Sequence, residues 1–200
     1  MTNNYPNYII GYHSCDKEVG LNILNGKEDL IKSNNPWDWL GEGVYFWEQN
    51  PYRSLEYSLE VAKGKQFNKK KINTPFILGT IIELGNCLNL LEPQSLEIIK
   101  KSFTSLKNIN KEAGTILPIN KGNNRALDCA VISYTHQSLL QENKQPYDTV
   151  RSTFNEGKEV YEGSAFTTRN HIQVCVTNLN MIKGYFLPRP IDIFNPFLKK

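Results

Sequence analysis

The sequence lacks the short motifs that mark the most widespread nucleotide-dependent and hydrolytic enzymes. No G-x-G-x-x-G follows an expected strand and no G-x-x-x-x-G-K-[S/T] occurs, so neither a Rossmann site nor a P-loop is indicated. The H-E-x-x-H zinc motif and the G-x-S-x-G nucleophile elbow are also absent. Residues that carry any chemistry must therefore be dispersed along the chain.

Cysteines and long apolar runs are scarce as well. The four cysteines, Cys15, Cys87, Cys129 and Cys175, form no C-x-x-C pair and have no metal-ligand spacing. The start of the chain, "MTNNYPNY", has neither a charged n-region nor an apolar h-region. No apolar run approaches the roughly 20 residues of a membrane-spanning helix. We therefore expect a reduced, soluble, cytoplasmic protein with no metal site and no contact to a membrane.

What the chain does contain is enough apolar sequence for one folded domain. Of its 200 residues, 40% are hydrophobic and 22% are charged, and we expect residues 1–200 to form a single domain. The net charge of +3 is only a mild signal for an acidic partner. The densest basic run is "KGKQFNKKK", from Lys63 to Lys71, which is either an ordinary solvated loop or a contact to a phosphate backbone.

Apolar periodicity and cap residues predict an α+β domain. Asp16 is an expected helix N-cap and Gly26 a helix stop, while Asn50 followed by Pro51 predicts a second helix start. The expected helices span residues 16–26, 52–64, 93–110 and 123–141. The expected strands span residues 7–15, 43–48, 75–91, 148–154, 171–178 and 182–189. Strands from both ends of the chain therefore build the sheet, and the middle of the chain is a helical insertion.

Two elements of this pattern carry finer expectations. The segment 75–91 reads as one long strand or as two strands interrupted at Gly85, because β-branched and apolar residues dominate it. The helix at 123–141 is expected to be buried on one side, by Leu127, Ala130, Val131 and Tyr134.

Histidine is rare, with three in the chain, and His13 directly follows Tyr12 at the end of the first expected strand. A neutral imidazole at the edge of a core needs only one donor and one acceptor, which backbone groups can supply. A nucleophilic pair of Cys15 with His171 is an alternative use of these residues, although lone cysteines are usually buried small hydrophobes. His13 is therefore either a structural imidazole or part of a dispersed site.

Three dispersed elements carry a family resemblance. They are "YHSC" at the end of the first strand, "GEGVYFWE" with the helix "NPYRSLEYS" behind it, and "HIQVCV" after a polar loop. At these residues the chain resembles the ADP-ribosyltransferase superfamily, in the PARP-like branch whose signature is His, Tyr and Glu on three separate strands. His13, Tyr45 and Gln173 fall on the three signature positions. The resemblance implies an ADP-ribosyltransferase-like split β-sandwich with peripheral helices.

The resemblance also implies that NAD is the substrate. Breaking the bond between nicotinamide and ribose passes through an oxocarbenium-like sugar, so the site must fix the ribose, hold the leaving ring and stabilise positive charge. By resemblance, His13 would hydrogen-bond a ribose hydroxyl, the backbone of Ser14 would hold the nicotinamide amide, and Tyr45 would stack on the ring. Ser14 stands where the family usually has glycine. The reaction requires no metal.

Gln173 is the main departure from the family pattern, which has glutamate there. A glutamine can position a hydroxyl, but it carries no charge and cannot act as a base. The departure argues against polymer formation and leaves transfer of a single ADP-ribose or hydrolysis of NAD. A carboxylate of the preceding loop would supply the missing charge or deprotonate an acceptor, Glu162 first and Glu159 or Glu156 second, unless these are ordinary solvated residues.

Two arginines and three tryptophans lie near these elements. Arg53 and Arg169 are candidates for binding the NAD pyrophosphate, because a guanidinium suits bidentate phosphate contacts, and a surface salt bridge is the alternative for each. Trp47 is expected in the core, while Trp37 and Trp39 are either core residues or stacking platforms.

The sequence thus predicts an NAD-dependent mono-ADP-ribosyltransferase that modifies a nucleic acid or a protein and releases nicotinamide. Bacterial members of this superfamily often act as toxins in toxin–antitoxin or phage-defence loci, so an antitoxin protein is an expected partner. Two alternatives stay open. One is a catalytically silent module that binds ADP-ribose or NAD, which Gln173 favours; the other is an RNA 2′-phosphotransferase-like enzyme, which would need several arginines near the NAD site.

Overall fold

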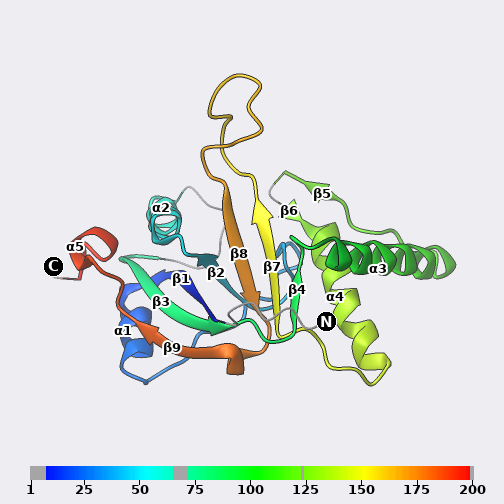
Figure 1. The fold of residues 1–200 in the computed structure, drawn as a ribbon, viewed down its shortest axis with the longest axis horizontal. Helices are drawn as coiled ribbons and strands as arrows, with labels where there is room; N and C mark the ends of the chain where they lie inside the picture. Colours follow the sequence, from blue (N-terminus) through cyan, green and yellow to red (C-terminus); the bar gives the residue numbers. More distant parts are fainter. Residues whose placement is uncertain (1–7, 65–71, 123, 199–200) are drawn as a thin grey trace.

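Seven strands form one mixed sheet in the computed structural model, which describes residues 8–64, 72–122 and 124–198 (Figure 1). The strand order is β4-β7-β8-β2-β1-β3-β9, and each neighbouring pair is antiparallel except β4 with β7. The strands are β1 (Tyr8–Asp16), β2 (Val44–Glu48), β3 (Pro75–Glu83), β4 (Cys87–Asn89), β7 (Thr149–Phe154), β8 (His171–Val176) and β9 (Ile182–Phe186).

Helices pack around this sheet, and a short separate hairpin precedes the fourth of them. The helices are α1 (Lys17–Leu24), α2 (Pro51–Ala62), α3 (Pro93–Glu112), α4 (Ala126–Gln141), α5 (Ile191–Phe194) and the 3₁₀ turn η1 (Leu179–Met181). The hairpin consists of β5 (Asn120–Lys121) and β6 (Asn124–Arg125). The predicted α+β class is therefore confirmed. Over the described ranges, no helix combines the length and the apolar character needed to cross a membrane.

The two helix starts predicted from cap residues are confirmed by their hydrogen bonds. The Asp16 carboxylate accepts from the backbone N–H of Glu18 at 3.1 Å. The Asn50 side chain accepts from the backbone N–H of Arg53 at 2.9 Å, and Pro51 occupies the first turn. These side chains satisfy N–H groups that the first turn of a helix leaves without a backbone partner. As a result α2 begins within three residues of the end of β2.

The segment 75–91 forms two strands, β3 and β4, with Gly85 between them at a φ of 58°. A Cβ at this position would lie 2.6 Å from a carboxylate oxygen of Asp148, so the close approach as well as the positive φ requires glycine. Asp148 in turn accepts from the backbone N–H of Asn86 at 2.9 Å. The turn sends the chain across the sheet, from β3 beside β9 to β4 at the opposite edge.

Helix α4 has a different buried stripe from the one predicted. Its buried residues are Cys129, Val131, Ile132 and Thr135. Val131 is confirmed, whereas the other predicted positions, Leu127, Ala130 and Tyr134, are only partly buried. The reason is that α4 contacts both α3 and the sheet, so its apolar residues extend round the helix instead of forming one narrow stripe.

The two faces of the sheet can be assigned from the strand register. Trp47 is directly opposite Tyr12 on one side and Gln173 on the other, and directly opposed residues share a face. The ring of Trp47 contacts Tyr57 of α2, with 5.0 Å between centroids, so we name this the α2 face. Phe46 alternates with Trp47 along β2 and therefore lies on the opposite face, the α1 face.

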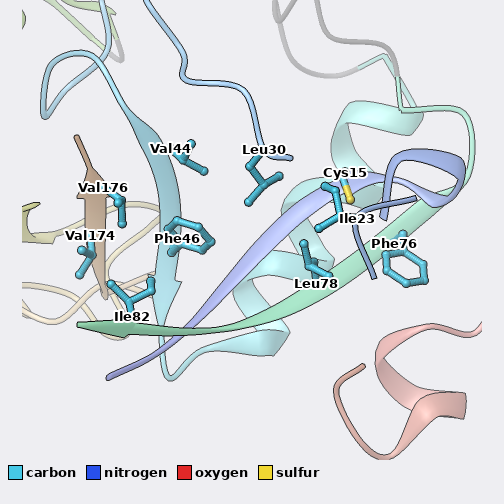
Figure 2. Close-up of a cluster of buried hydrophobic side chains, with 10 residues drawn as sticks. All are labelled: Cys15, Ile23, Leu30, Val44, Phe46, Phe76, Leu78, Ile82, Val174 and Val176. Carbon is cyan, nitrogen blue, oxygen red and sulfur yellow. The ribbon is translucent and has the colours of Figure 1, made fainter. Parts of the chain in front are cut away.

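Each face carries its own hydrophobic cluster. The cluster on the α1 face is shown in Figure 2 and comprises Cys15, Ile23, Leu30, Val44, Phe46, Phe76, Leu78, Ile82, Val174 and Val176. The cluster on the α2 face lies under α4 and comprises Leu40, Leu88, Ile132, Val150, Phe154 and Cys175. The sheet thus carries a buried cluster on each face.

The sheet opens between β1 and β2. These strands pair only at Gly11 with Glu48 and at Tyr12 with Trp47, whereas β1 pairs with β3 along all 9 of its residues. Beyond Tyr12, β1 therefore has no partner strand on its β2 side among the described residues. His13 is the first residue at this opening.

Candidate functional site

The three strands predicted to carry the signature residues lie next to one another, in the order β8-β2-β1. Tyr45 of β2 is opposite Cys175 of β8, two residues from Gln173. Tyr45 and Gln173 therefore share the α2 face, because side chains alternate along each strand. His13 follows Tyr12 and points to the α1 face, at the opening. The fold thus brings residues that are far apart in the sequence onto three adjacent strands, but the side chain of His13 lies on the opposite face of the sheet from those of Tyr45 and Gln173.

The imidazole of His13 bridges the opening between β1 and β2. Its Nδ1 lies 2.8 Å from the backbone carbonyl of Tyr45, and its ring lies 5.7 Å from the ring of Phe46. Since a carbonyl only accepts, Nδ1 must carry the proton, and the neutral ring has its lone pair on Nε2. A backbone hydrogen bond of this kind is what we expect if His13 has a structural role. The same bond fixes the tautomer in which Nε2 can accept a hydrogen bond from a hydroxyl.

Tyr45 packs against the hydrophobic cluster of the α2 face, and its hydroxyl is held by the loop before β2. The hydroxyl accepts from the backbone N–H of Leu40 at 2.9 Å and donates to the carbonyl of Gly41 at 2.7 Å. Burial raises the pKa of the Tyr45 phenol well above its ordinary value, so the hydroxyl stays protonated. Tyr45 therefore anchors this loop, and its predicted stacking on nicotinamide remains a prediction.

Ser14 joins β1 to α2. Its hydroxyl donates to the backbone carbonyl of Ser54 at 2.6 Å and lies 2.9 Å from the Ser54 hydroxyl. Ser54 and Ser58 are fully buried, because small side chains let α2 approach the sheet closely. Sequence reasoning placed the helix "NPYRSLEYS" behind the tyrosine strand but did not single out Ser54.

The two arginines predicted to bind pyrophosphate are both held by carboxylates. The Arg53 guanidinium is 7% exposed, lies 2.8 Å from Glu156 and also pairs with Glu56 at 3.3 Å. Arg169, at 33% exposure, pairs with Glu56 at 2.6 Å and with Glu60. Both arginines therefore form salt bridges in this structure, which was the alternative to pyrophosphate binding. A phosphate would have to displace these carboxylates.

Of the three loop carboxylates, the structure brings Glu156 to the site. Glu156 is the partner of Arg53, beside His171 of β8. Glu159 accepts from the backbone N–H of Gly163 within the loop. Glu162, the first choice from the sequence, is exposed and makes no side-chain hydrogen bond or ion pair with the described residues. The loop between β7 and β8 that carries these residues projects away from the sheet (Figure 1).

Gln173 is hydrogen-bonded to His171, which sequence reasoning considered only as a partner of Cys15. The Gln173 amide nitrogen lies 2.9 Å from Nε2 of His171, and Nδ1 of His171 lies 2.7 Å from the backbone carbonyl of Arg169. Residues two apart in a strand share a face, and this spacing is the signal that could have found the pair. Cys15 belongs to the cluster of the α1 face, so the structure does not bring it to His171.

A cavity of about 570 Å³ adjoins the Gln173 side of the site. It lies between α3, α4 and β7, and Ser152 and Phe154 on its wall are directly opposite Gln173 and His171. Trp39 lines the cavity with its ring 4.6 Å from that of Phe154.

The three tryptophans differ in their surroundings. Trp47 is buried, as predicted, whereas Trp37 is 39% exposed in the loop before β2. Trp39 lies in the same loop, and the guanidinium of Arg125 covers its ring at 5.5 Å. Trp39 is therefore a cavity residue that already has a cation over its ring.

Two further expectations concern the basic run and metal binding. Residues 65–71 of the basic run lie outside the described residues, and Lys63 directly follows α2 at the surface. In the part of the chain that the structure describes, no group of three or more His, Cys, Asp or Glu side chains is placed to hold a metal ion.

Comparisons with other proteins give one similarity over nearly the whole chain. An uncharacterized protein of Methanocaldococcus jannaschii is 26% identical over 204 aligned positions, which cover 92% of this chain and 90% of the relative. No family model and no solved structure matches the chain.

Proposed function

We propose that this chain is a cytoplasmic NAD-dependent mono-ADP-ribosyltransferase with an ADP-ribosyltransferase-like split β-sandwich. One observation carries the proposal: the strands of His13, Tyr45 and Gln173 are neighbours in the order β8-β2-β1, and the sheet opens between β1 and β2. Nothing in the local sequence requires distant strands to be adjacent, so this adjacency supports the resemblance independently of the motifs themselves.

In the proposed reaction, the bond between ribose C1′ and the nicotinamide nitrogen of NAD breaks, and nicotinamide leaves with the bonding electron pair. A nucleophilic atom of the acceptor forms the new bond to C1′ and loses its proton to a base or to water. Gln173 would position a ribose hydroxyl without contributing charge, so the cationic sugar would be stabilised mainly by orientation. This is consistent with transfer of one ADP-ribose and not with chain elongation.

NAD fits one half of the candidate site better than the other. On the α2 face the nicotinamide ribose has a candidate partner in Gln173, and the indole N–H of Trp47 is a buried donor without a hydrogen-bond partner among the described residues. His13 lies on the α1 face and would reach the ribose only through the opening between β1 and β2. The pyrophosphate has no such ready partner. We propose that it exchanges with Glu56 at Arg169, since Arg169 is the more exposed of the two arginines.

The acceptor would enter through the cavity beside Gln173. Its wall combines aromatic and cationic groups, with Trp39 and Phe154 near Arg125 and Lys100, which favours a nucleobase over an aliphatic side chain. Glu156 is the carboxylate proposed to deprotonate it, because Glu162, the first choice from the sequence, is exposed on the projecting loop. A toxin or phage-defence effector restrained by an antitoxin remains the proposed biological setting.

The decisive measurement is release of nicotinamide from labelled NAD by the purified protein, alone and with RNA, DNA or cell lysate. We expect release, with label on one acceptor pool, and losses of about a hundredfold in His13→Ala and Gln173→Ala. Gln145→Ala, at an exposed position between α4 and β7, is the matched control and should release nicotinamide at the wild-type rate. Absence of release under every condition would contradict the proposal.

A second candidate is favoured by one observation, the uncharged Gln173. A silent module would bind ADP-ribose or NAD and release no nicotinamide, which the same assay with a binding measurement would reveal. Removal of a 2′-phosphate from RNA in the presence of NAD would instead identify the phosphotransferase-like alternative.

A further inference from the structure

The side chains of His171 and Gln173 form a hydrogen-bonded pair whose polarity is determined by a third group. Nδ1 of His171 lies 2.7 Å from the carbonyl oxygen of Arg169. A carbonyl cannot donate, so Nδ1 carries the hydrogen and Nε2 of the neutral ring carries a lone pair. Nε2 therefore accepts, and the group 2.9 Å away must be the NH₂ of Gln173 as a donor.

This orientation leaves the carbonyl oxygen of Gln173 directed away from His171. That oxygen accepts no hydrogen bond from the described residues, and Gln173 is only partly buried. Its neighbours across the strands are Trp47 and Ser152, the latter on the wall of the cavity. The amide thus offers its carbonyl oxygen as an acceptor on the α2 face, next to the second N–H of the NH₂ group, which His171 does not use.

We infer that His171 is a positioning residue, which holds the Gln173 amide so that its carbonyl oxygen accepts a hydrogen bond from a hydroxyl of the bound sugar. In this arrangement the carbonyl oxygen of Gln173 accepts a hydrogen bond where one oxygen of a glutamate carboxylate would accept it, but the amide carries no negative charge. The inference rests on the proposed function for the identity of the sugar, while the orientation of the amide rests on the hydrogen bonds alone.

The surroundings keep His171 rigid and neutral. It is 7% exposed, and its ring stacks on Phe154 at 5.6 Å with an interplanar angle of 21°. Burial lowers the pKa of the imidazole below its ordinary value, and the nearby Arg53 acts in the same direction. The carboxylates of Glu156 and Glu56 act in the opposite direction.

Protonation of His171 would reverse the arrangement. Nε2 would become a donor, the Gln173 amide would rotate to offer its oxygen to the ring, and its NH₂ would face the ligand. The site would lose its acceptor. Sugar binding and turnover should therefore fall as the pH is lowered through the pKa of His171.

The test compares His171→Phe in two backgrounds. Phenylalanine keeps the packing on Phe154 but cannot accept a hydrogen bond. We expect about a tenfold loss in the rate of nicotinamide release, and loss of the acidic limb of the pH profile, when residue 173 is glutamine. In the Gln173→Glu background the same change should cost less than about twofold, because both carboxylate oxygens are acceptors. An equal loss in both backgrounds would show that His171 is merely structural and overturn the inference.

A second arm reads the amide orientation without turnover. Nitrogen NMR should show the Nδ1–H tautomer of His171 and a coupling across the hydrogen bond between Nε2 of His171 and the amide nitrogen of Gln173. An Nε2–H tautomer would place the carbonyl against the ring and overturn the inference. If the coupling is present but nicotinamide is never released, the proposed function fails, and the inference is tested by the affinity for ADP-ribose instead. The affinity is measured for the wild type, His171→Phe, Gln173→Glu and the double variant. His171→Phe must weaken ADP-ribose binding about tenfold when residue 173 is glutamine and less than about twofold when it is glutamate, or the inference fails.

Discussion

At the scale of single residues, Gly20 shows how one position controls the contact between a helix and the sheet. A Cβ on Gly20 would lie 2.2 Å from a ring carbon of Phe76, which is 1% exposed in the cluster of the α1 face. Real Cβ atoms do not approach so closely, so glycine is needed here although it disfavours helix formation. The packing of α1 on β3 depends on this missing side chain.

We predict that Gly20→Ala destabilises the protein by roughly 1–3 kcal/mol, because the core must rearrange around the added methyl group. In an uncrowded helix the same change would stabilise by about 0.5–1 kcal/mol. Urea denaturation of the variant and of Asn22→Ala, in the same helix, provides the measurement. A free energy of unfolding at or above the wild-type value would mean that the close contact with Phe76 is not present.

At the scale of elements, an ion pair joins strands that are not neighbours. Arg151 of β7 and Glu48 of β2 lie on either side of β8 and meet in two contacts of 2.6 Å and 2.8 Å. Their side chains are 17% and 10% exposed. Arg151 also donates to Asn89 of β4 at 3.3 Å, so this guanidinium links one edge of the sheet to its centre.

Glu48→Gln should destabilise the protein by about 3–5 kcal/mol, since it leaves a mostly buried guanidinium without its countercharge. The matched control is Lys144→Gln, which breaks a pair with Glu142 on the surface; exposed pairs of this kind contribute about 0–1 kcal/mol. Urea is the suitable denaturant because it adds no salt. Similar losses in the two variants would refute the argument from burial.

At the scale of the whole molecule, buried histidines couple folding to pH. Burial lowers the pKa of both His136 and His171 below the ordinary histidine value. Nε2 of His136 has no hydrogen-bond partner among the described residues, and its ring lies 5.8 Å from that of Tyr147. The native state therefore holds these rings neutral, whereas the unfolded chain protonates them below about pH 6.5.

Stability should fall as the pH is lowered, because the pKa values of both histidines are lower in the folded state than in the unfolded chain. Below the unfolded pKa the unfolded state binds more protons than the native state, so stability falls with falling pH until the native pKa is reached. We predict a decrease in Tm between pH 7 and about pH 5, with a shallower slope in His136→Phe, which keeps the ring but removes one titrating group. Thermal unfolding followed by circular dichroism measures both. A Tm independent of pH over this range would contradict the prediction.

Much of the local structure was predictable because it depends on near neighbours in the chain. Asp16 and Asn50 cap helices because a side chain can reach N–H groups two or three residues ahead. The strand around Gln173 and the strand around Tyr45 follow from runs of apolar and β-branched residues. The burial of Trp47 was likewise predictable from its size and its place in an aromatic strand.

Other features depended on contacts across the chain. No local pattern identifies Glu156 as the partner of Arg53, which is 103 residues away, or indicates that Arg169 is already held by carboxylates of α2. The crossing of the sheet after Gly85 also depends on Asp148, far along the sequence. These pairings are selected by the packing of the whole core.

The α+β class, the helix caps and the three candidate strands follow from short stretches of sequence, because backbone preference and side-chain periodicity act over a few residues. The adjacency of β8, β2 and β1, the opening of the sheet beside His13 and the hydrogen bond between His171 and Gln173 follow only from the folded chain. Strand order is set by the sum of many long-range contacts, which no short stretch of the chain contains.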